Sequence, residues 1–156
     1  MSRYVVEPLA GHDRATFSSG SESLDRHFYQ QVTQDVRRRI ASCFVAVSDD
    51  GELAGFYTLA ATSLAFDRLS AERASRLPRY PVVPGILLGR LAVAKAHQGR
   101  RLGGALVADA LLRSARTEIV GHILVVDAID DAAARFYQHL GFEPLADDRH
   151  RLIRPI

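Results

Sequence analysis

The stretch LGRLAVAKAHQGRRLGGALVADALLRSA, residues 88–115, changes character in its middle. It opens as an apolar run typical of a buried strand and closes as an alanine- and leucine-rich segment with helical spacing. Between them lies the turn Gln98-Gly99-Arg100-Arg101-Leu102-Gly103-Gly104. A helix that begins at such a turn offers unpaired N–H groups and the positive end of its dipole, so the stretch predicts an anion site with phosphate as its natural guest.

Two common phosphate motifs do not match this turn. The Walker pattern needs Lys-Ser or Lys-Thr after its last glycine, whereas Gly104 is followed by Ala105-Leu106. The dinucleotide fingerprint needs G-x-G-x-x-G after the first strand of a βαβ unit, and this turn lies past the middle of the chain with other spacing. Taken alone, the turn is equally compatible with a structural turn that binds nothing.

The composition predicts a globular protein. With 156 residues, 47% of them hydrophobic, we expect one domain over residues 1–156. The only cysteine, Cys43, lies in an apolar run, which favours a buried core thiol in a reducing compartment. No apolar stretch has the length of a signal peptide or a membrane span, so we expect a soluble, cytoplasmic protein without a membrane partner.

Charge and histidine placement restrict the chemistry. The net charge is only +2, yet 19 of the 20 basic residues are arginine, which is a weak indication of a polyanionic partner. No histidine or cysteine lies in an H-E-x-x-H or C-x-x-C setting, so we expect no metal site.

Periodicity along the chain predicts a mixed α/β domain of one sheet with helices on it. The first half of the chain is expected to form a strand at Val5-Val6, one helix with Leu24, Phe28, Val32 and Val36 on a single face, and a hairpin over 43–61 that turns at 49–51. A short helix from Ser70 to about Arg76 and a proline loop to Gly85 follow, and then a strand over 86–93 that is buried on both faces. The rest is expected to form a helix over 102–118, a buried strand over 122–128, a helix from Asp130 or Asp131 to a Gly141 cap, and a terminal hairpin.

A second constellation, DDAAARFYQHLGF at residues 130–142, follows the strand after the opening stretch. Both helices then begin at the same end of neighbouring parallel strands, where open α/β sheets bind ligands. The pattern V-x4-QG-x-x-LG before a helix, then A-x-x-FY-x-x-LGF after the next strand, resembles the Gcn5-related N-acetyltransferase (GNAT) superfamily. That resemblance implies a mixed sheet of six to seven strands, with helices on both faces, splayed between the fourth and fifth strands.

The same resemblance implies acetyl-coenzyme A as co-substrate, with no metal. The glycine turn would hold its pyrophosphate, and Tyr137 would protonate the departing thiolate. The residues implied to contact acetyl-coenzyme A are Leu91, Ala92, Val93, Gln98, Gly99, Arg100, Arg101, Leu102, Gly103, Gly104, Ala105, Asp130 and Phe136.

One residue departs from the family pattern Q/R-x-x-G-x-G/A. Placing Gln98 at its first position puts Arg101 where the first glycine belongs. A second register, starting at Arg100, satisfies the letters but moves the turn two residues along the helix; we prefer the first because of its five-residue interval from Val93. Arg101 is then expected to have a strained or differently wound backbone, with its side chain reaching a phosphate.

Three flanking segments, SGSESLD at 19–25, GFYTL at 55–59 and LGRLAV at 88–93, are similar to acetyltransferase toxins of bacterial type II toxin–antitoxin pairs. This resemblance implies that the chain acetylates the α-amino group of aminoacyl-tRNA and blocks translation. It also implies a small antitoxin of ribbon-helix-helix type and a homodimer.

The acceptor amine must be neutral to attack. Strand 86–93 and the loop from Leu77 contain no Asp or Glu to serve as a base, which favours an α-amine of pKa near ~8 over lysine near ~10.4. The arginines predicted to contact the substrate are Arg37, Arg38, Arg39, Arg79 and Arg90. Arginines ending a helix can also simply offset its dipole, and an arginine inside a buried strand needs a carboxylate partner or a place in the cleft.

Two other functions fit the same residues. One is a housekeeping acetyltransferase for a small amine, an antibiotic or a protein N-terminus. The other is a non-catalytic module that binds acetyl-coenzyme A without turnover.

Overall fold

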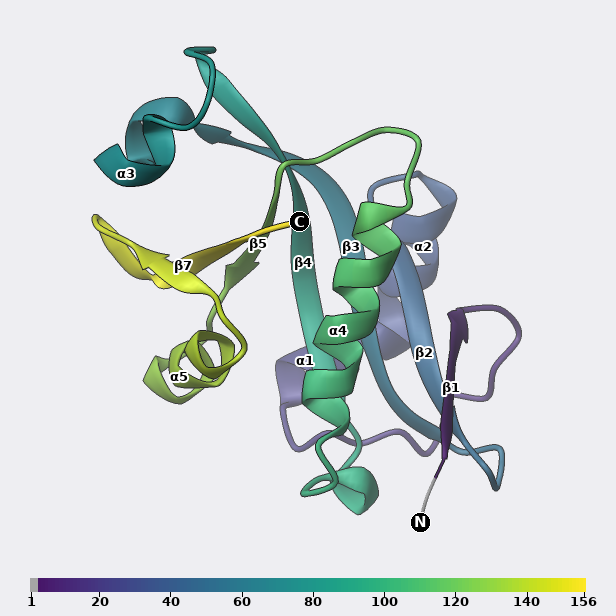
Figure 1. Ribbon diagram of the computed structural model, residues 1–156. Helices are drawn as coiled ribbons and strands as arrows, with labels where there is room; N and C mark the ends of the chain where they lie inside the picture. Colours follow the sequence, from purple (N-terminus) through teal and green to yellow (C-terminus); the bar gives the residue numbers. More distant parts are fainter. Residues whose placement is uncertain (1–2) are drawn as a thin grey trace. The chain divides into compact units, whose positions relative to one another are not determined.

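The structure is a computed structural model that describes residues 3–156 (Figure 1). Its strands follow the order β1-β2-β3-β4-β5-β7-β6 in one sheet. The chain divides into two compact units: Met1–Ala60 with Gly89–Ala110, and Ala61–Leu88 with Leu111–Ile156. The single domain expected from the sequence stays a prediction.

The first unit contains an antiparallel ribbon. Strand β1 (Tyr4–Pro8) pairs with β2 (Ser42–Ser48), and β2 pairs with β3 (Leu53–Ala65). The hairpin between β2 and β3 was predicted, and Gly51, with φ +80°, supplies the left-handed residue of its turn.

The helix predicted from Leu24 to Val36 is two helices, so that prediction is wrong. Helix α1 (Glu22–Gln30) and helix α2 (Val32–Arg37) meet at Gln31, where φ is −118° and ψ is −34°. The turn at Gln31 changes the phase of the helical face. Phe28 and Val32 are therefore fully buried, while Val36 is 37% exposed.

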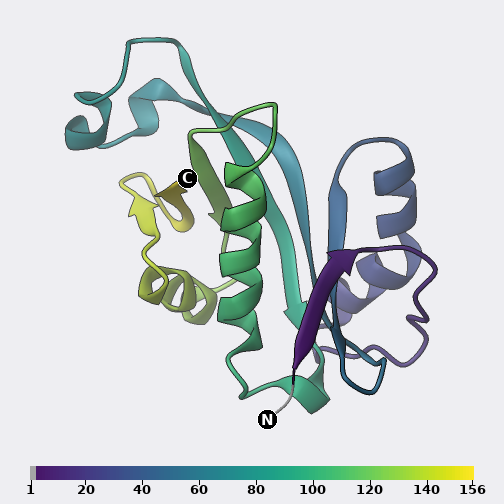
Figure 2. The ribbon, with the colours of Figure 1, turned by 45° about the vertical axis from the view of Figure 1, so that its right-hand side comes forward.

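Helices cover both faces of the sheet in the first unit. Phe56 of β3 stacks on Phe28 of α1, with ring centroids 4.2 Å apart, whereas its neighbour Gly55 faces α4 (Leu102–Ala115). A Cβ at Gly55 would lie 3.0 Å from a methyl of Leu106, so β3 needs glycine where α4 packs. Figures 1 and 2 show α4 on one side of the strands and the pair α1 and α2 on the other.

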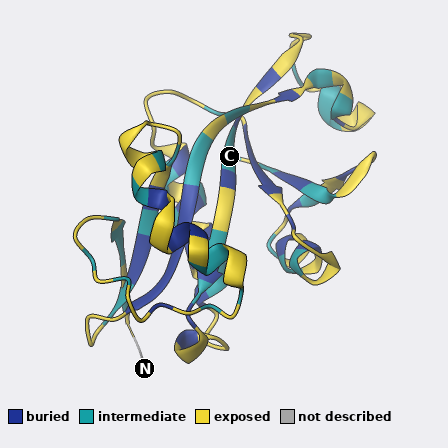
Figure 3. Ribbon diagram, turned by 180° about the vertical axis from the view of Figure 1, so that it is seen from behind, coloured by how far each residue is buried: buried dark blue, intermediate teal, exposed yellow. Residues whose placement is uncertain are grey.

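Cys43 belongs to the core of this unit, as predicted. The side chain is 4% exposed, and burial raises the pKa of the Cys43 thiol to about 12. The thiol is therefore protonated and unreactive at neutral pH. In Figure 3 the buried residues follow β2 and β3, while the outer sides of the helices are exposed.

The second unit is built on a parallel pair and a hairpin. Residues 85–88 of β4 (Val82–Val93) pair in parallel with residues 123–126 of β5 (Ile123–Asp127). β7 (Asp148–Pro155) pairs antiparallel with both β5 and β6 (Glu143–Leu145), which gives the predicted terminal hairpin. The parallel pairs between β4 and β5 run from Gly85 to Leu88, although β4 continues to Val93.

Three short helical segments complete this unit. A 3-10 turn, η1 (Phe66–Arg68), precedes α3 (Ala71–Ala74), whose predicted cap Ser70 accepts a hydrogen bond from the Arg73 N–H. Helix α5 (Asp131–His139) packs against β6 and β7. Among the residues that the structure describes, no helix is long and apolar enough to cross a membrane.

Two predictions for β4 are wrong. The strand begins at Val82 and contains Pro84, because Pro84 contributes only its carbonyl, which accepts from the His122 N–H at 2.8 Å. The strand is also not buried on both faces. Gly89 and Arg90 are exposed, since they lie beyond the part of β4 that pairs with β5.

Candidate active site

The predicted phosphate turn lies in the first unit, between a 3-10 turn, η2 (Lys95–His97), and α4. Two of its residues have left-handed backbone: Gly99 with φ +77° and Arg101 with φ +62°. A non-glycine residue pays about 1–2 kcal/mol for this conformation. The expectation of an unusual backbone at Arg101 is confirmed.

Gln98, the first residue of the turn, fixes its beginning through two side-chain hydrogen bonds. Its side-chain Nε2 donates to the Val93 carbonyl at 3.0 Å and to the Ser19 carbonyl at 2.8 Å. The five-residue interval from Val93 to Gln98 is thus closed by a hydrogen bond, which supports the register that places Arg101 at the first glycine position. Gln98 also joins the turn to the loop that leads into α1.

His97, the buried residue just before the turn, was not predicted to have a role. His97 is 7% exposed, its Nδ1 lies 2.9 Å from the Tyr4 hydroxyl, and its Nε2 lies 3.3 Å from Glu52 Oε2. Arg100 in turn donates to the same Tyr4 hydroxyl at 3.4 Å. Tyr4 and Glu52 are distant in sequence, so no local pattern could have signalled this contact.

The start of α4 fits an anionic group. Leu102 is buried and anchors the helix, while Gly99, Arg100 and Arg101 are exposed. A Cβ placed on Gly99 would meet nothing within 4 Å, so the turn is open on that side. Because the first N–H groups of a helix have no intrahelical partner, this open turn can donate to a pyrophosphate, and Arg100 and Arg101 add positive charge to the same turn.

Helix α5 and Tyr137 lie in the second unit. Asp130 is the N-cap and accepts from the Ala133 N–H at 2.8 Å, and Gly141, with φ +90°, follows the end of the helix, both as predicted. The Asp130 carboxylate therefore has a structural task at this position. Its contact with acetyl-coenzyme A stays a prediction.

Tyr137 is held between two aromatic rings. The Tyr137 ring meets Phe136 and Phe142 edge to face, with centroids 5.1 and 5.5 Å away. Tyr137 is 8% exposed, and burial raises its pKa to about 12. Its hydroxyl has no hydrogen-bond partner within residues 3–156, so it is a neutral donor ready for a ligand.

The remaining predicted acetyl-coenzyme A contacts fall on two elements. Leu91, Ala92 and Val93 form the end of β4, where Ala92 is buried and its two neighbours are half-buried. Gly103, Gly104 and Ala105 form the first turn of α4.

Arg90 is exposed rather than buried, which corrects the sequence expectation. Its backbone N–H donates to Thr58 Oγ1 at 3.0 Å. Burial, together with the positive charge of Arg90, lowers the pKa of His27, a buried residue of α1 whose Nε2 lies 3.8 Å from Asp35 Oδ2. Arg90 thus acts electrostatically on a neutral imidazole.

The other arginines predicted to contact substrate are exposed. Arg37, Arg38 and Arg39 are consecutive at the end of α2, and Arg39 has φ +59°, the left-handed conformation that often ends a helix. Arg79 lies in the second unit, on the loop after α3. No group of three His, Cys, Asp or Glu side chains able to hold a metal occurs within residues 3–156.

The family model described as an acetyltransferase (GNAT) domain matches residues 39–144, more than half of the chain. The chain belongs to the GNAT acetyltransferase family. The predicted fold and activity class are confirmed: this GNAT protein is an N-acetyltransferase that uses acetyl-coenzyme A.

Three of the proteins that the GNAT chain is similar to act on tRNA or bind acetyl-coenzyme A, as their names state. It is 38% identical over 133 residues to the tRNA-acetylating toxin of Mycobacterium tuberculosis, covering 84% of this chain and 78% of the toxin. AtaT complexed with acetyl-methionyl-tRNA superposes with a TM-score of 0.88 at 28% identity, over 98% of this chain and 95% of AtaT. A mutant AtaT bound to the C-terminus of the antitoxin AtaR and acetyl-coenzyme A gives 0.80 at 27% identity, over 97% and 92%.

Proposed function

We propose that this chain is a toxin that transfers the acetyl group of acetyl-coenzyme A to the α-amino group of aminoacyl-tRNA and so blocks translation. The observation that carries the proposal is the 38% identity to a tRNA-acetylating toxin over 84% of the chain. The likeness to AtaT complexed with acetyl-methionyl-tRNA supports the same acceptor.

The turn before α4 is the proposed pyrophosphate seat. Gly99 and Arg101, both left-handed, turn the backbone so that N–H groups of the first turn of α4 are open to an anion. The side chains of Arg100 and Arg101 add positive charge to that seat. The N–H groups of Leu91 and Val93, at the C-terminal end of β4, are proposed to hold the thioester carbonyl and to stabilise the charge that develops on its oxygen.

Tyr137 is the proposed general acid. The amine attacks the thioester carbonyl directly, a C–N bond forms and the C–S bond breaks. Tyr137 gives its proton to the sulfur and regains one from solvent, while the amine loses its extra proton to solvent. The pKa near 12 keeps the phenol protonated at any physiological pH, and its unpaired hydroxyl leaves it free to donate.

The acceptor chemistry agrees with an α-amine. Residues 77–93 carry no carboxylate that could serve as a base, and an α-amine of pKa near ~8 is neutral often enough at pH 7 to react without one. The exposed arginines 37–39 and 79, together with Arg90, are proposed to contact the RNA.

The proposed partners follow from the same relatives. A mutant AtaT binds the C-terminus of its antitoxin, which supports a small antitoxin for this chain, and we propose one of ribbon-helix-helix type. We also propose a homodimer acting in the cytoplasm, where charged tRNA is found.

One assay tests the proposal. The protein is incubated with labelled acetyl-coenzyme A and total tRNA, either charged or stripped of amino acids, and in parallel with small amines and peptides. Label on charged but not on stripped tRNA is the expected result. Label on peptides or small amines alone would replace the toxin with the housekeeping acetyltransferase, and binding of acetyl-coenzyme A without transfer would leave a non-catalytic module.

A further inference from the structure

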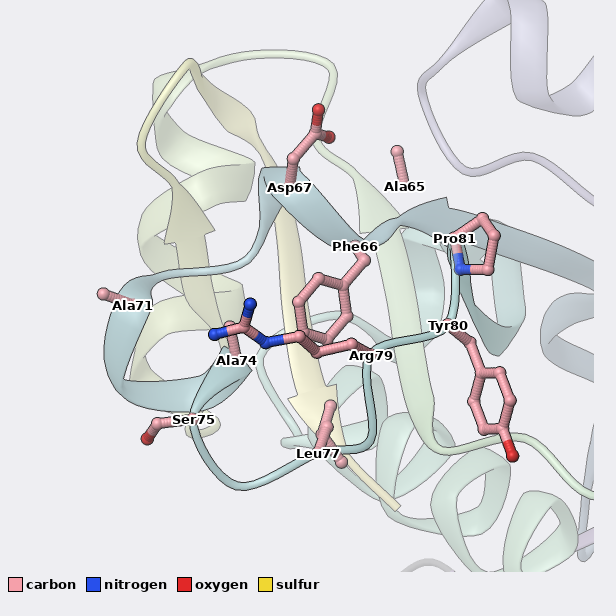
Figure 4. Close-up of a pocket in the computed structure, with 10 residues that line it drawn as sticks. All are labelled: Ala65, Phe66, Asp67, Ala71, Ala74, Ser75, Leu77, Arg79, Tyr80 and Pro81. Atoms are coloured by element: carbon pink, nitrogen blue, oxygen red, sulfur yellow. The ribbon is translucent and has the colours of Figure 1, made fainter.

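A cavity of about 870 Å³ lies in the second unit, away from any residue assigned above except Arg79 (Figure 4). Its volume is within the range of about 300–1,000 Å³ that small-molecule sites occupy. The lining comes from the end of β3, η1, α3 and the loop before β4, and consists of Ala65, Phe66, Asp67, Ala71, Ala74, Ser75, Leu77, Arg79, Tyr80 and Pro81.

The apolar part of the cavity is fixed by the core beneath it. Phe66, Ala74 and Leu77 are partly buried and pack on the core cluster of this unit. The Phe66 N–H donates to the Pro81 carbonyl at 3.0 Å, which joins the two walls of the cavity. An apolar ligand group therefore finds a preformed surface.

Arg79 supplies an exposed guanidinium to the lining of the cavity. Its side chain extends past Phe66 toward α3 in Figure 4, and it makes no hydrogen bond or ion pair with any residue in 3–156. The neighbouring arginines differ, because Arg68 pairs with Asp147, Arg73 with Glu143 and Arg76 with Glu72. In the same view the Asp67 carboxylate points away from Arg79.

Tyr80 adds a second aromatic ring to the lining of the cavity. It is 67% exposed, and in Figure 4 its ring points away from the Arg79 guanidinium, whereas the Phe66 ring lies next to the Arg79 side chain. Aromatic rings together with an arginine suit a single-stranded nucleic acid, since bases can stack on the rings and a phosphate can take the guanidinium fork. An acidic peptide segment would suit the cavity less well, because three of the four arginines around it are already paired.

We infer that this cavity binds a single-stranded segment of the RNA substrate, with a phosphate on Arg79 and bases against Phe66 and Tyr80. The inference rests on the proposed function, which makes an RNA the acceptor, and it adds a recognition site that is independent of the transfer chemistry at Tyr137.

The test is direct RNA binding by the full chain. The probe is a fluorescein-labelled, single-stranded RNA of eight nucleotides ending in CCA, and affinity is read by fluorescence anisotropy over a range of salt concentrations. Arg79→Gln is expected to weaken binding about tenfold and to lower the salt slope by about 0.7, as for the loss of one phosphate contact on a single strand. Arg79→Lys should restore the salt slope, since it keeps the charge.

Tyr80→Ser is expected to weaken binding about fivefold to a hundredfold without changing the salt slope, because stacking is not a charge effect. Arg76→Gln is the matched control: it is an exposed arginine of the same loop, outside the cavity and paired with Glu72. Its affinity should stay within about twofold of wild type. Thermal unfolding of each variant confirms that the compared chains are folded.

Equal RNA affinity for wild type, Arg79→Gln and Tyr80→Ser would overturn the inference. So would a result in which these variants keep RNA affinity but lose binding to a purified protein partner, since the cavity would then be a protein-docking site. The proposed function is tested separately, by tRNA acetylation with the wild-type chain. If the wild type acetylates charged tRNA but the variants bind RNA normally, only the cavity inference is rejected. If RNA binding depends on the cavity but the wild type does not acetylate tRNA, only the proposed acceptor is rejected.

Discussion

The side-chain Nε2 of Gln98 lies 3.0 Å from the Val93 carbonyl oxygen and closes the turn before α4 into a hydrogen-bonded loop. The same nitrogen reaches the Ser19 carbonyl at 2.8 Å. Because the shape of this loop decides which N–H groups the proposed pyrophosphate seat offers, we propose that Gln98 holds the seat in position.

Gln98→Met keeps the length of the side chain and removes both donors. Each lost hydrogen bond costs about 1 kcal/mol, so we expect the KM for acetyl-coenzyme A to rise about tenfold while kcat changes little. Steady-state kinetics with acetyl-coenzyme A as the varied substrate measure this. Gln31→Met is the control, since Gln31 also donates through Nε2, to Asp35, but lies outside the turn. A variant with the wild-type KM would show that the loop holds its shape without Gln98.

Arg101 stores backbone strain that glycine would not. Its φ of +62° lies in the left-handed region, which disfavours every side chain. We expect Arg101→Gly to be more stable than Arg101→Ala by about 1 kcal/mol, because both lose the charge but only glycine tolerates the conformation. Urea unfolding measures the difference.

At the neighbouring Arg100, the glycine variant should be the less stable of the two. Arg100 does not have a positive φ, so Arg100→Gly should be less stable than Arg100→Ala by about 0.5–1 kcal/mol, the usual cost of glycine. If the Gly and Ala variants rank in the same order at both positions, the left-handed backbone of Arg101 carries no strain.

Features that depend on neighbouring residues could be predicted from the sequence, whereas features that depend on distant residues could not. Capping residues such as Ser70 and Asp130, the glycine turns and the apolar strand β5 are local signals, and each was predicted correctly. The break at Gln31 was not, because apolar residues that recur every four positions give the same pattern in one long helix as in two consecutive helices with a break between them.

Long-range contacts explain the other misses. Arg90 was expected inside a buried strand, but the partner strand pairs only as far as Leu88, which no pattern within β4 announces. His97 acquires its role under the turn from Tyr4 and Glu52, residues that the chain brings from far away. Arg101 shows the reverse case, since the family pattern alone predicted its unusual backbone.

Tyr137→Phe tests the general acid. The ring contacts with Phe136 and Phe142 stay, so the fold should be kept, while kcat is expected to fall by about 10²–10⁴. In the wild type, the rate should rise with pH until the acceptor α-amine is neutral, near ~8, and should not fall again up to pH 9, because Tyr137 with a pKa of about 12 is still protonated there. A wild-type rate that declines between pH 8 and 9, or a Phe variant of unchanged kcat, would contradict this role.

Burial of Cys43 and Tyr137 makes the fold sensitive to alkali. Both groups have pKa values of about 12 in the folded chain, against 9.0 and 10.0 when free. Above pH 9 the unfolded chain therefore loses protons that the folded chain keeps, and the free energy of unfolding falls as pH rises, by at most about 1.4 kcal/mol per pH unit for each group. Urea unfolding between pH 8 and 11 measures the slope. Cys43→Ala lowers stability at every pH through the lost packing, yet its decline between pH 9 and 11 should be shallower than that of the wild type. Parallel curves for the two proteins would mean that the thiol titrates alike in the folded and unfolded chains.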